Sequence, residues 1–123
     1  MHVSRDFFEC LVRDAVMGLP DQFLSSMDNV SIIVADQATP AQKVENGLEP
    51  NEVLYGLYEG VPLTERGGYA PSLPDLITIF QYPIEAESET MSELKRQVIT
   101  TVKHEVAHYF GFSDSALDEM GLG

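Results

Sequence analysis

Apolar residues recur at helical spacing in two stretches, one toward each end of the sequence. In residues 3–17 they fall every three or four positions and stop before a Gly-Leu-Pro segment, which predicts an N-terminal helix. From about Ser88 the same spacing returns and continues to Gly111, a residue type that commonly ends helices. Thr90 followed by Glu93 resembles a capping box, so we expect this second, longer helix to begin there.

Three shorter apolar runs between these helices are rich in β-branched or aromatic residues, which is typical of strands. They are residues 30–36, 53–60 and 75–84. The third is nearly unbroken from Leu76 to Phe80, as expected of a central strand covered on both faces. Residues 37–52 and 61–74 are rich in Pro, Gly and polar residues, which predicts loops. The order of elements predicts one α+β domain over residues 1–123.

Composition limits the classes of partner. The 123 residues include 20 acidic and 7 basic ones, for a formal net charge of −13, while the hydrophobic fraction of 44% favours a folded domain. Such an acidic chain repels phosphate backbones and anionic lipid, so we expect binding neither to nucleic acid nor to a membrane surface. No stretch approaches the roughly 20 apolar residues that a membrane-spanning helix needs.

Cysteine usage and the N-terminal sequence indicate a compartment. The one cysteine, Cys10, excludes an intrachain disulfide and fits a reducing cytoplasm. Its apolar neighbours in the predicted N-terminal helix favour a buried structural thiol. Charged residues interrupt the first twenty positions, so a signal-peptide core is not expected. We therefore predict a cytoplasmic protein.

The candidate chemistry lies on the long C-terminal helix. His104 and His108 are four residues apart and so project from the same side, one turn apart. Two imidazoles at this spacing can bind one zinc ion, and Glu105 can then act on water without being a ligand. The alternative is a solvated helix face, with Glu105 paired to Lys103 or Arg96. Histidine is scarce in this chain, with three in all, which favours the metal interpretation.

Two further residues extend the pattern to HExxHxxGxxD. A catalytic zinc takes three protein ligands and keeps a fourth position open. Gly111 lets the chain leave the helix sharply, which places Asp114 as a candidate third ligand. A lone HExxH arises by chance on the order of a few times per thousand chains of this length, and the extended form roughly once per hundred thousand. Alternatively, Ser113 or Asp114 caps a short final helix, and Asp118 or a water completes the site.

The segment HEVAHYFGFSD, together with the preceding run GLYEGVPLTERGGYAPSLPDLITIFQYPIE, resembles the small bacterial zincin-like zinc metallopeptidases over roughly residues 50–121. The resemblance implies an α+β zincin-like core, in which a small mixed sheet of about three to four strands packs against the N-terminal helix and the metal-binding helix. It also implies Zn²⁺ bound by His104, His108 and Asp114, with Glu105 as the general base. It implies no particular substrate.

We therefore expect a zinc-dependent hydrolase, in the first place a peptidase that acts on a peptide or small protein. An extended substrate would pair with the sheet edge at residues 53–60 as an added strand. Several side chains are open candidates for stabilising the oxyanion: Tyr55, Tyr58, Arg66 and Tyr69.

Nine residues of the sequence follow Asp114, too few for the subdomain with which larger zincins wall their substrate cleft. Three interpretations follow: a small or flexible substrate, a cleft completed by a partner or a second copy in a homodimer, or a site without efficient turnover. The alternatives to a peptidase are therefore a non-catalytic zincin-like module for metal-dependent binding, and an acidic interaction domain without metal.

Overall fold

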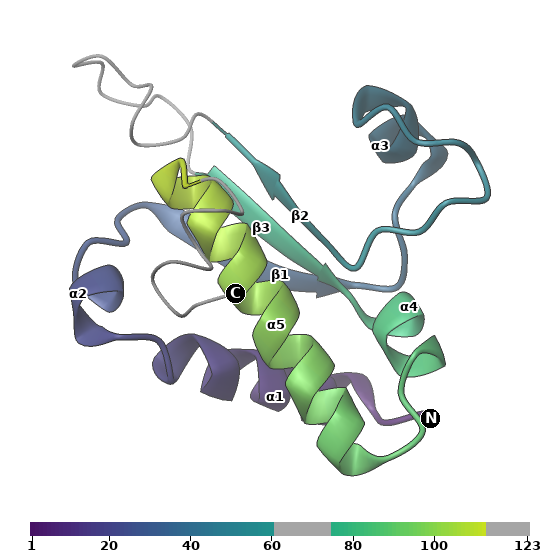
Figure 1. Ribbon diagram of the computed structural model, residues 1–123, viewed down its shortest axis with the longest axis horizontal. Helices are drawn as coiled ribbons and strands as arrows, with labels where there is room; N and C mark the ends of the chain where they lie inside the picture. Colours follow the sequence, from purple (N-terminus) through teal and green to yellow (C-terminus); the bar gives the residue numbers. More distant parts are fainter. Residues whose placement is uncertain (61–74, 113–123) are drawn as a thin grey trace.

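The computed structural model describes residues 1–60 and 75–112 of the chain (Figure 1). Its helices and strands follow one another as α1 (Arg5–Met17), α2 (Asp21–Leu24), β1 (Val30–Ala35), α3 (Pro40–Glu45), β2 (Gly56–Glu59), β3 (Asp75–Phe80), α4 (Gln81–Ala86) and α5 (Met91–Phe110). The N-terminal helix, the three strands and the long C-terminal helix are confirmed. The predicted loop at 61–74 lies outside the described residues. Within the described part of the chain, no helix is long and apolar enough to cross a membrane.

The three described strands form one mixed sheet in the order β1-β3-β2. β1 runs parallel to β3, whereas β2 runs antiparallel to it, with Gly56 opposite Ile79. Every residue of β3 except Leu76 is buried, which confirms the predicted central strand. β2 lies at an edge of this sheet, with α5 running beside it (Figure 1).

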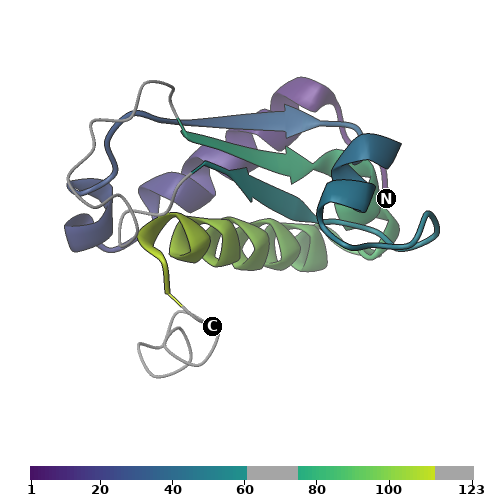
Figure 2. The same ribbon diagram turned by 90° about the horizontal axis from the view of Figure 1, so that it is seen from above.

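α1 and α5 pack against each other on one face of the sheet, and Figure 2 shows α5 lying along this face next to β2. The core between these elements is formed by fully buried side chains. They include Phe8 from α1, Ile77 and Ile79 from β3, and Leu94, Val98 and Val102 from α5. Each such burial contributes about 1.5–3 kcal/mol. The opposite face carries a smaller cluster of Ala38, Leu57 and Phe80.

Both ends of α5 are defined by the residues that the sequence indicated. The Thr90 hydroxyl accepts a hydrogen bond from the Glu93 N–H at 3.1 Å, and the Glu93 carboxylate accepts one from the Glu89 N–H at 3.0 Å. At the other end Gly111 has a left-handed φ of 80°, and its N–H donates to the carbonyl of His108 at 3.0 Å. Glycine adopts this left-handed conformation without a steric penalty, whereas residues with a Cβ are destabilised in it.

The prediction of a loop over residues 37–52 was wrong in part, because α3 lies within it. Thr39 and Gln42 form a complete capping box, with hydrogen bonds of 3.1 and 2.9 Å, and Pro40 occupies the first turn. Proline is tolerated there because that turn's N–H groups have no partner within the helix. Local capping thus creates a helix in a segment with little apolar content.

The predicted third strand also extends too far. It ends at Phe80 rather than at residue 84, and the chain turns directly into α4. The apolar pattern does not distinguish the two, and Pro83 is compatible with the first turn of a helix. The second strand is likewise shorter than residues 53–60. Cys10 is exposed, contrary to the predicted burial, because it projects from the solvent side of α1.

A buried carboxylate attaches the start of the chain to α4. Glu85 is 2% exposed and accepts hydrogen bonds from the Val3 N–H at 2.9 Å and the Gln81 amide at 3.1 Å. Burial raises the pKa of Glu85, but these hydrogen bonds and the neighbouring His2 outweigh it, so the pKa lies below its usual value. Nearby, Arg5 forms an ion pair with Asp36, which connects α1 to the end of β1.

Candidate metal centre

The two predicted histidine ligands converge near the C-terminal end of α5. Their Nε2 atoms lie 3.1 Å apart, and their ring centroids are 4.7 Å apart with the planes tilted by 54°. His104 is half-buried and His108 is exposed, so the pair opens toward solvent. Because both belong to one helix, their spacing is fixed by the backbone of α5.

The geometry of this pair fits a zinc ion. Zinc–nitrogen bonds of about 2.0–2.1 Å in a tetrahedral arrangement place two ligand nitrogens roughly 3.3–3.4 Å apart. The observed 3.1 Å is within a few tenths of an ångström of that distance. Among residues 1–60 and 75–112, no group of three or more His, Cys, Asp or Glu side chains is placed to hold a metal. Asp114 lies outside these ranges and stays a prediction.

Glu105 packs on the edge strand of the sheet. Its side chain is 7% exposed, and its Cγ and Oε2 atoms lie against Gly56 of β2. At about 100° per residue, Lys103 and Arg96 project from roughly the opposite side of α5. The alternative in which Glu105 serves as a surface ion-pair partner of these two residues is therefore not favoured.

The histidine pair lies on the same flank of α5 as its contacts with β2. Thr101 and Glu105 both meet Gly56. His108 follows Thr101 by seven residues, which is about 20° around the helix, and His104 is about 60° away from Thr101. The histidines therefore project beside β2, and on the side away from α1.

A family model described as zincin-like metallopeptidase matches residues 27–123. The chain belongs to the zincin-like metallopeptidase family. This confirms the family predicted from the motif, and the small mixed sheet with packed helices confirms the predicted α+β fold. No curated protein matches the chain.

The histidine-bearing end of α5 in this zincin-like chain is supported by aromatic contacts with other elements, and the contact from Phe23 was not predicted from the sequence. Phe23 of α2 packs edge-on against Phe110, with centroids 5.3 Å apart, and also against Phe112 at 6.1 Å. The ring of Tyr109 packs against Tyr58 of β2 at 6.0 Å. Such aromatic pairs each add about 0.5–1.5 kcal/mol beyond the area they bury. The short helix α2 thus supports the end of α5 that carries the histidines.

Two of the oxyanion candidates, Tyr58 and Tyr55, lie among the described residues. The Tyr58 hydroxyl lies with the Asp75 carboxylate against Gly60, where a Cβ added to the glycine would come within 2.9 Å of the hydroxyl. Burial raises the pKa of the Tyr55 hydroxyl, and the charge and hydrogen bond of Glu87 raise it further. Arg66 and Tyr69 lie outside the described residues, so the oxyanion donor stays an open prediction.

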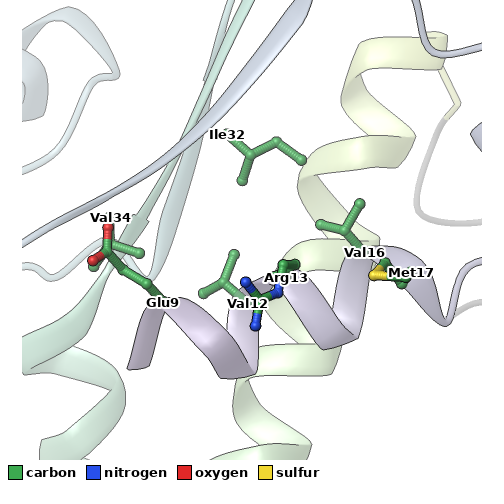
Figure 3. Close-up of a pocket in the computed structure, with 7 residues that line it drawn as sticks. All are labelled: Glu9, Val12, Arg13, Val16, Met17, Ile32 and Val34. Carbon is green, nitrogen blue, oxygen red and sulfur yellow. The ribbon is translucent and has the colours of Figure 1, made fainter. Parts of the chain in front are cut away.

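Two grooves between described residues lie away from the histidine pair. One groove of about 230 Å³ runs between α1 and β1 (Figure 3). Its lining residues are Glu9, Val12, Arg13, Val16, Met17, Ile32 and Val34. A second, of about 290 Å³, lies between α1 and the flank of α5 that carries Lys95, Ile99 and Lys103. Neither groove includes the histidine pair or Glu105.

Proposed function

We propose that this zincin-like chain is a zinc-dependent peptidase. His104, His108 and Asp114 hold the zinc ion, and Glu105 is the general base. The observation that carries the proposal is the pair of Nε2 atoms 3.1 Å apart, next to a buried glutamate on the same helix, in a chain of a metallopeptidase family.

The chemistry follows from these residue types. When bound, zinc supplies a Lewis acid that polarises the scissile carbonyl and acidifies water. The Glu105 carboxylate accepts a proton from the attacking water as the carbon–oxygen bond forms. It then gives that proton to the nitrogen of the leaving amine as the carbon–nitrogen bond breaks. Glu105 returns to its charged form, and the peptide has gained one water.

The substrate is an extended peptide that pairs with β2. This strand lies at an edge of the described sheet, and the flank of α5 beside it carries the histidines. Main-chain hydrogen bonds to such an edge bind a peptide largely independently of its sequence. The cytoplasmic location, the absence of nucleic-acid and membrane binding, and a homodimer that completes the cleft belong to the same proposal.

Metal content and cleavage together test the proposal. Protein purified without chelator or affinity tag should contain about one zinc per chain, and His104→Ala and His108→Ala should each lose it. Lys103→Ala, on the opposite side of α5, is the matched control and should keep it. Zinc-loaded protein should cleave members of a fluorescent peptide library, and Glu105→Ala should reduce cleavage to a small residual rate while it retains zinc.

The outcomes separate the candidate functions. Zinc bound without cleavage above the Glu105→Ala background would leave a metal-dependent binding module. Wild-type protein without zinc would exclude both the peptidase and the metal-dependent binding module. An acidic interaction domain would then remain.

A further inference from the structure

Gly56 is the point at which the edge strand β2 meets the metal helix α5. A Cβ atom at this position would lie 2.7 Å from Cγ2 of Thr101 and 2.9 Å from Cγ of Glu105, with Oε2 of Glu105 at 3.3 Å. Cβ atoms essentially never approach other heavy atoms closer than 3.0 Å. Any larger residue here therefore requires a side chain or an element to shift.

The surroundings leave Glu105 as the group that yields. The Thr101 hydroxyl donates to the carbonyl of Gln97 at 2.8 Å, which holds the threonine methyl against the strand. Gly56 is held in register by its antiparallel pairing with Ile79 of the central strand. α5 itself is held by fully buried core residues such as Val98. The Glu105 side chain has three rotatable bonds, so it can change its position while the backbone of α5 and β2 stays in place.

We propose that Gly56 is a positioning residue, which keeps the Glu105 carboxylate beside the histidine pair by leaving the space of a side chain empty. In its catalytic sense this inference rests on the proposed function. The proposal also gives β2 a second role. The strand that would bind the peptide is also the strand against which the general base Glu105 packs. β2 would then position both the peptide and the Glu105 side chain that packs on it, which favours productive alignment.

A rate cycle tests the catalytic part. Gly56→Ala should lower kcat by about 10²-fold, the usual cost of a misplacement of about 1 Å, with KM within about twofold. Zinc content should stay at the wild-type level because the histidine spacing is unchanged. In the Glu105→Ala background the same substitution should leave the residual rate within about twofold. If Gly56→Ala lowers kcat by the same factor in the Glu105→Ala background as in the wild type, the two residues act independently and the proposal is wrong.

A stability cycle tests the contact on metal-free protein and needs no catalysis. Gly56→Ala should lower Tm by roughly 5–10 °C, as overpacking in a domain of this size does. In a Glu105→Ala/Thr101→Ser background, which removes both close atoms, the decrease should be less than half as large. An equal decrease in both backgrounds would overturn the proposal. Wild-type protein that cleaves no peptide would remove the proposed function, and this cycle would still decide whether Gly56 provides the space that Thr101 and Glu105 need.

Two further variants provide a control and an alternative in case Gly56→Ala does not fold. Gly18→Ala is the matched control, because a Cβ there meets only backbone oxygens at 3.4 and 3.6 Å, and it should leave kcat unchanged. If Gly56→Ala does not fold, Gly56→Ala/Thr101→Ser removes the closest contact and leaves only that with Glu105. This double variant should keep zinc and still lose kcat. Wild-type kcat in it would contradict the positioning role.

Discussion

The Tyr109 hydroxyl forms two hydrogen bonds with the backbone of Asp28. It donates to the Asp28 carbonyl at 2.9 Å and accepts from the Asp28 N–H at 3.1 Å. Tyr109 is fully buried and lies one residue after His108, whereas Asp28 lies in the segment between α2 and β1. One side chain therefore fixes the histidine-bearing end of α5 relative to the sheet.

Tyr109→Phe should remove both hydrogen bonds and lower the free energy of unfolding by about 1–3 kcal/mol. The lower part of this range is expected, since Asp28 is exposed and water can replace the hydroxyl. Urea denaturation gives the value. Tyr82→Phe is the matched control, because Tyr82 is 50% exposed and should be nearly neutral. Equal costs for the two variants would contradict this anchoring role.

Gly111→Ala should destabilise the protein by about 1–2 kcal/mol, the cost of a left-handed conformation for a residue with a Cβ. The reason is its φ of 80° immediately after α5. Gly18 ends α1 with a φ of −82°, so Gly18→Ala should change stability far less. Chemical denaturation of the two variants side by side measures the difference. A similar loss in both would show that the left-handed turn is not what makes Gly111 necessary.

Zinc should raise the thermal stability of the wild-type protein, and a chelator should reverse the effect. At a free zinc concentration of about 100 times Kd, the stabilisation is about 2.7 kcal/mol for a ligand that binds only the folded state. His108→Ala should abolish this shift. His2→Ala should keep it, because His2 lies at the far end of the chain with a side chain 93% exposed. A zinc-dependent shift that survives in His108→Ala would place the metal elsewhere.

Glu85 should contribute to acid sensitivity. Its folded-state pKa lies below the ordinary value of 4.5, so it stabilises the fold at pH values above that. This contribution is lost as the pH falls from about 4.5 through the lower folded-state pKa. Glu85→Gln should therefore flatten the decrease in unfolding free energy over this window, measured by urea titrations at several pH values. An unchanged slope in Glu85→Gln would contradict this role.

Local sequence signals predicted the elements that carry the site. α5 begins after Thr90 and ends before Gly111, because capping and the left-handed turn are decided by neighbouring residues alone. The histidine pair follows directly from its spacing on that helix. The burial of Glu105 was not predicted from the sequence and is a finding of the structure.

Contacts between distant segments could not be predicted in the same way. The packing of Glu105 against Gly56 depends on the position of β2 at the sheet edge, which no local pattern encodes. The same is true of the support that Phe23 gives to Phe110. The error at α4 has another cause, because a short apolar run fits a strand and a buried helical turn equally well. The capping box at Thr39 was present in the sequence and could have indicated α3.

The imidazoles of His104 and His108 come from one helix whose inner side packs in the core, so two of the three proposed ligands are already held close together without a metal. Small zinc modules that draw their ligands from separate loops unfold when the metal leaves. Here zinc binding should change the protein structure little, because α5 already holds the two histidines close together. If the proposed zinc site is correct, the metal-free protein should therefore remain folded and should bind zinc without first having to refold.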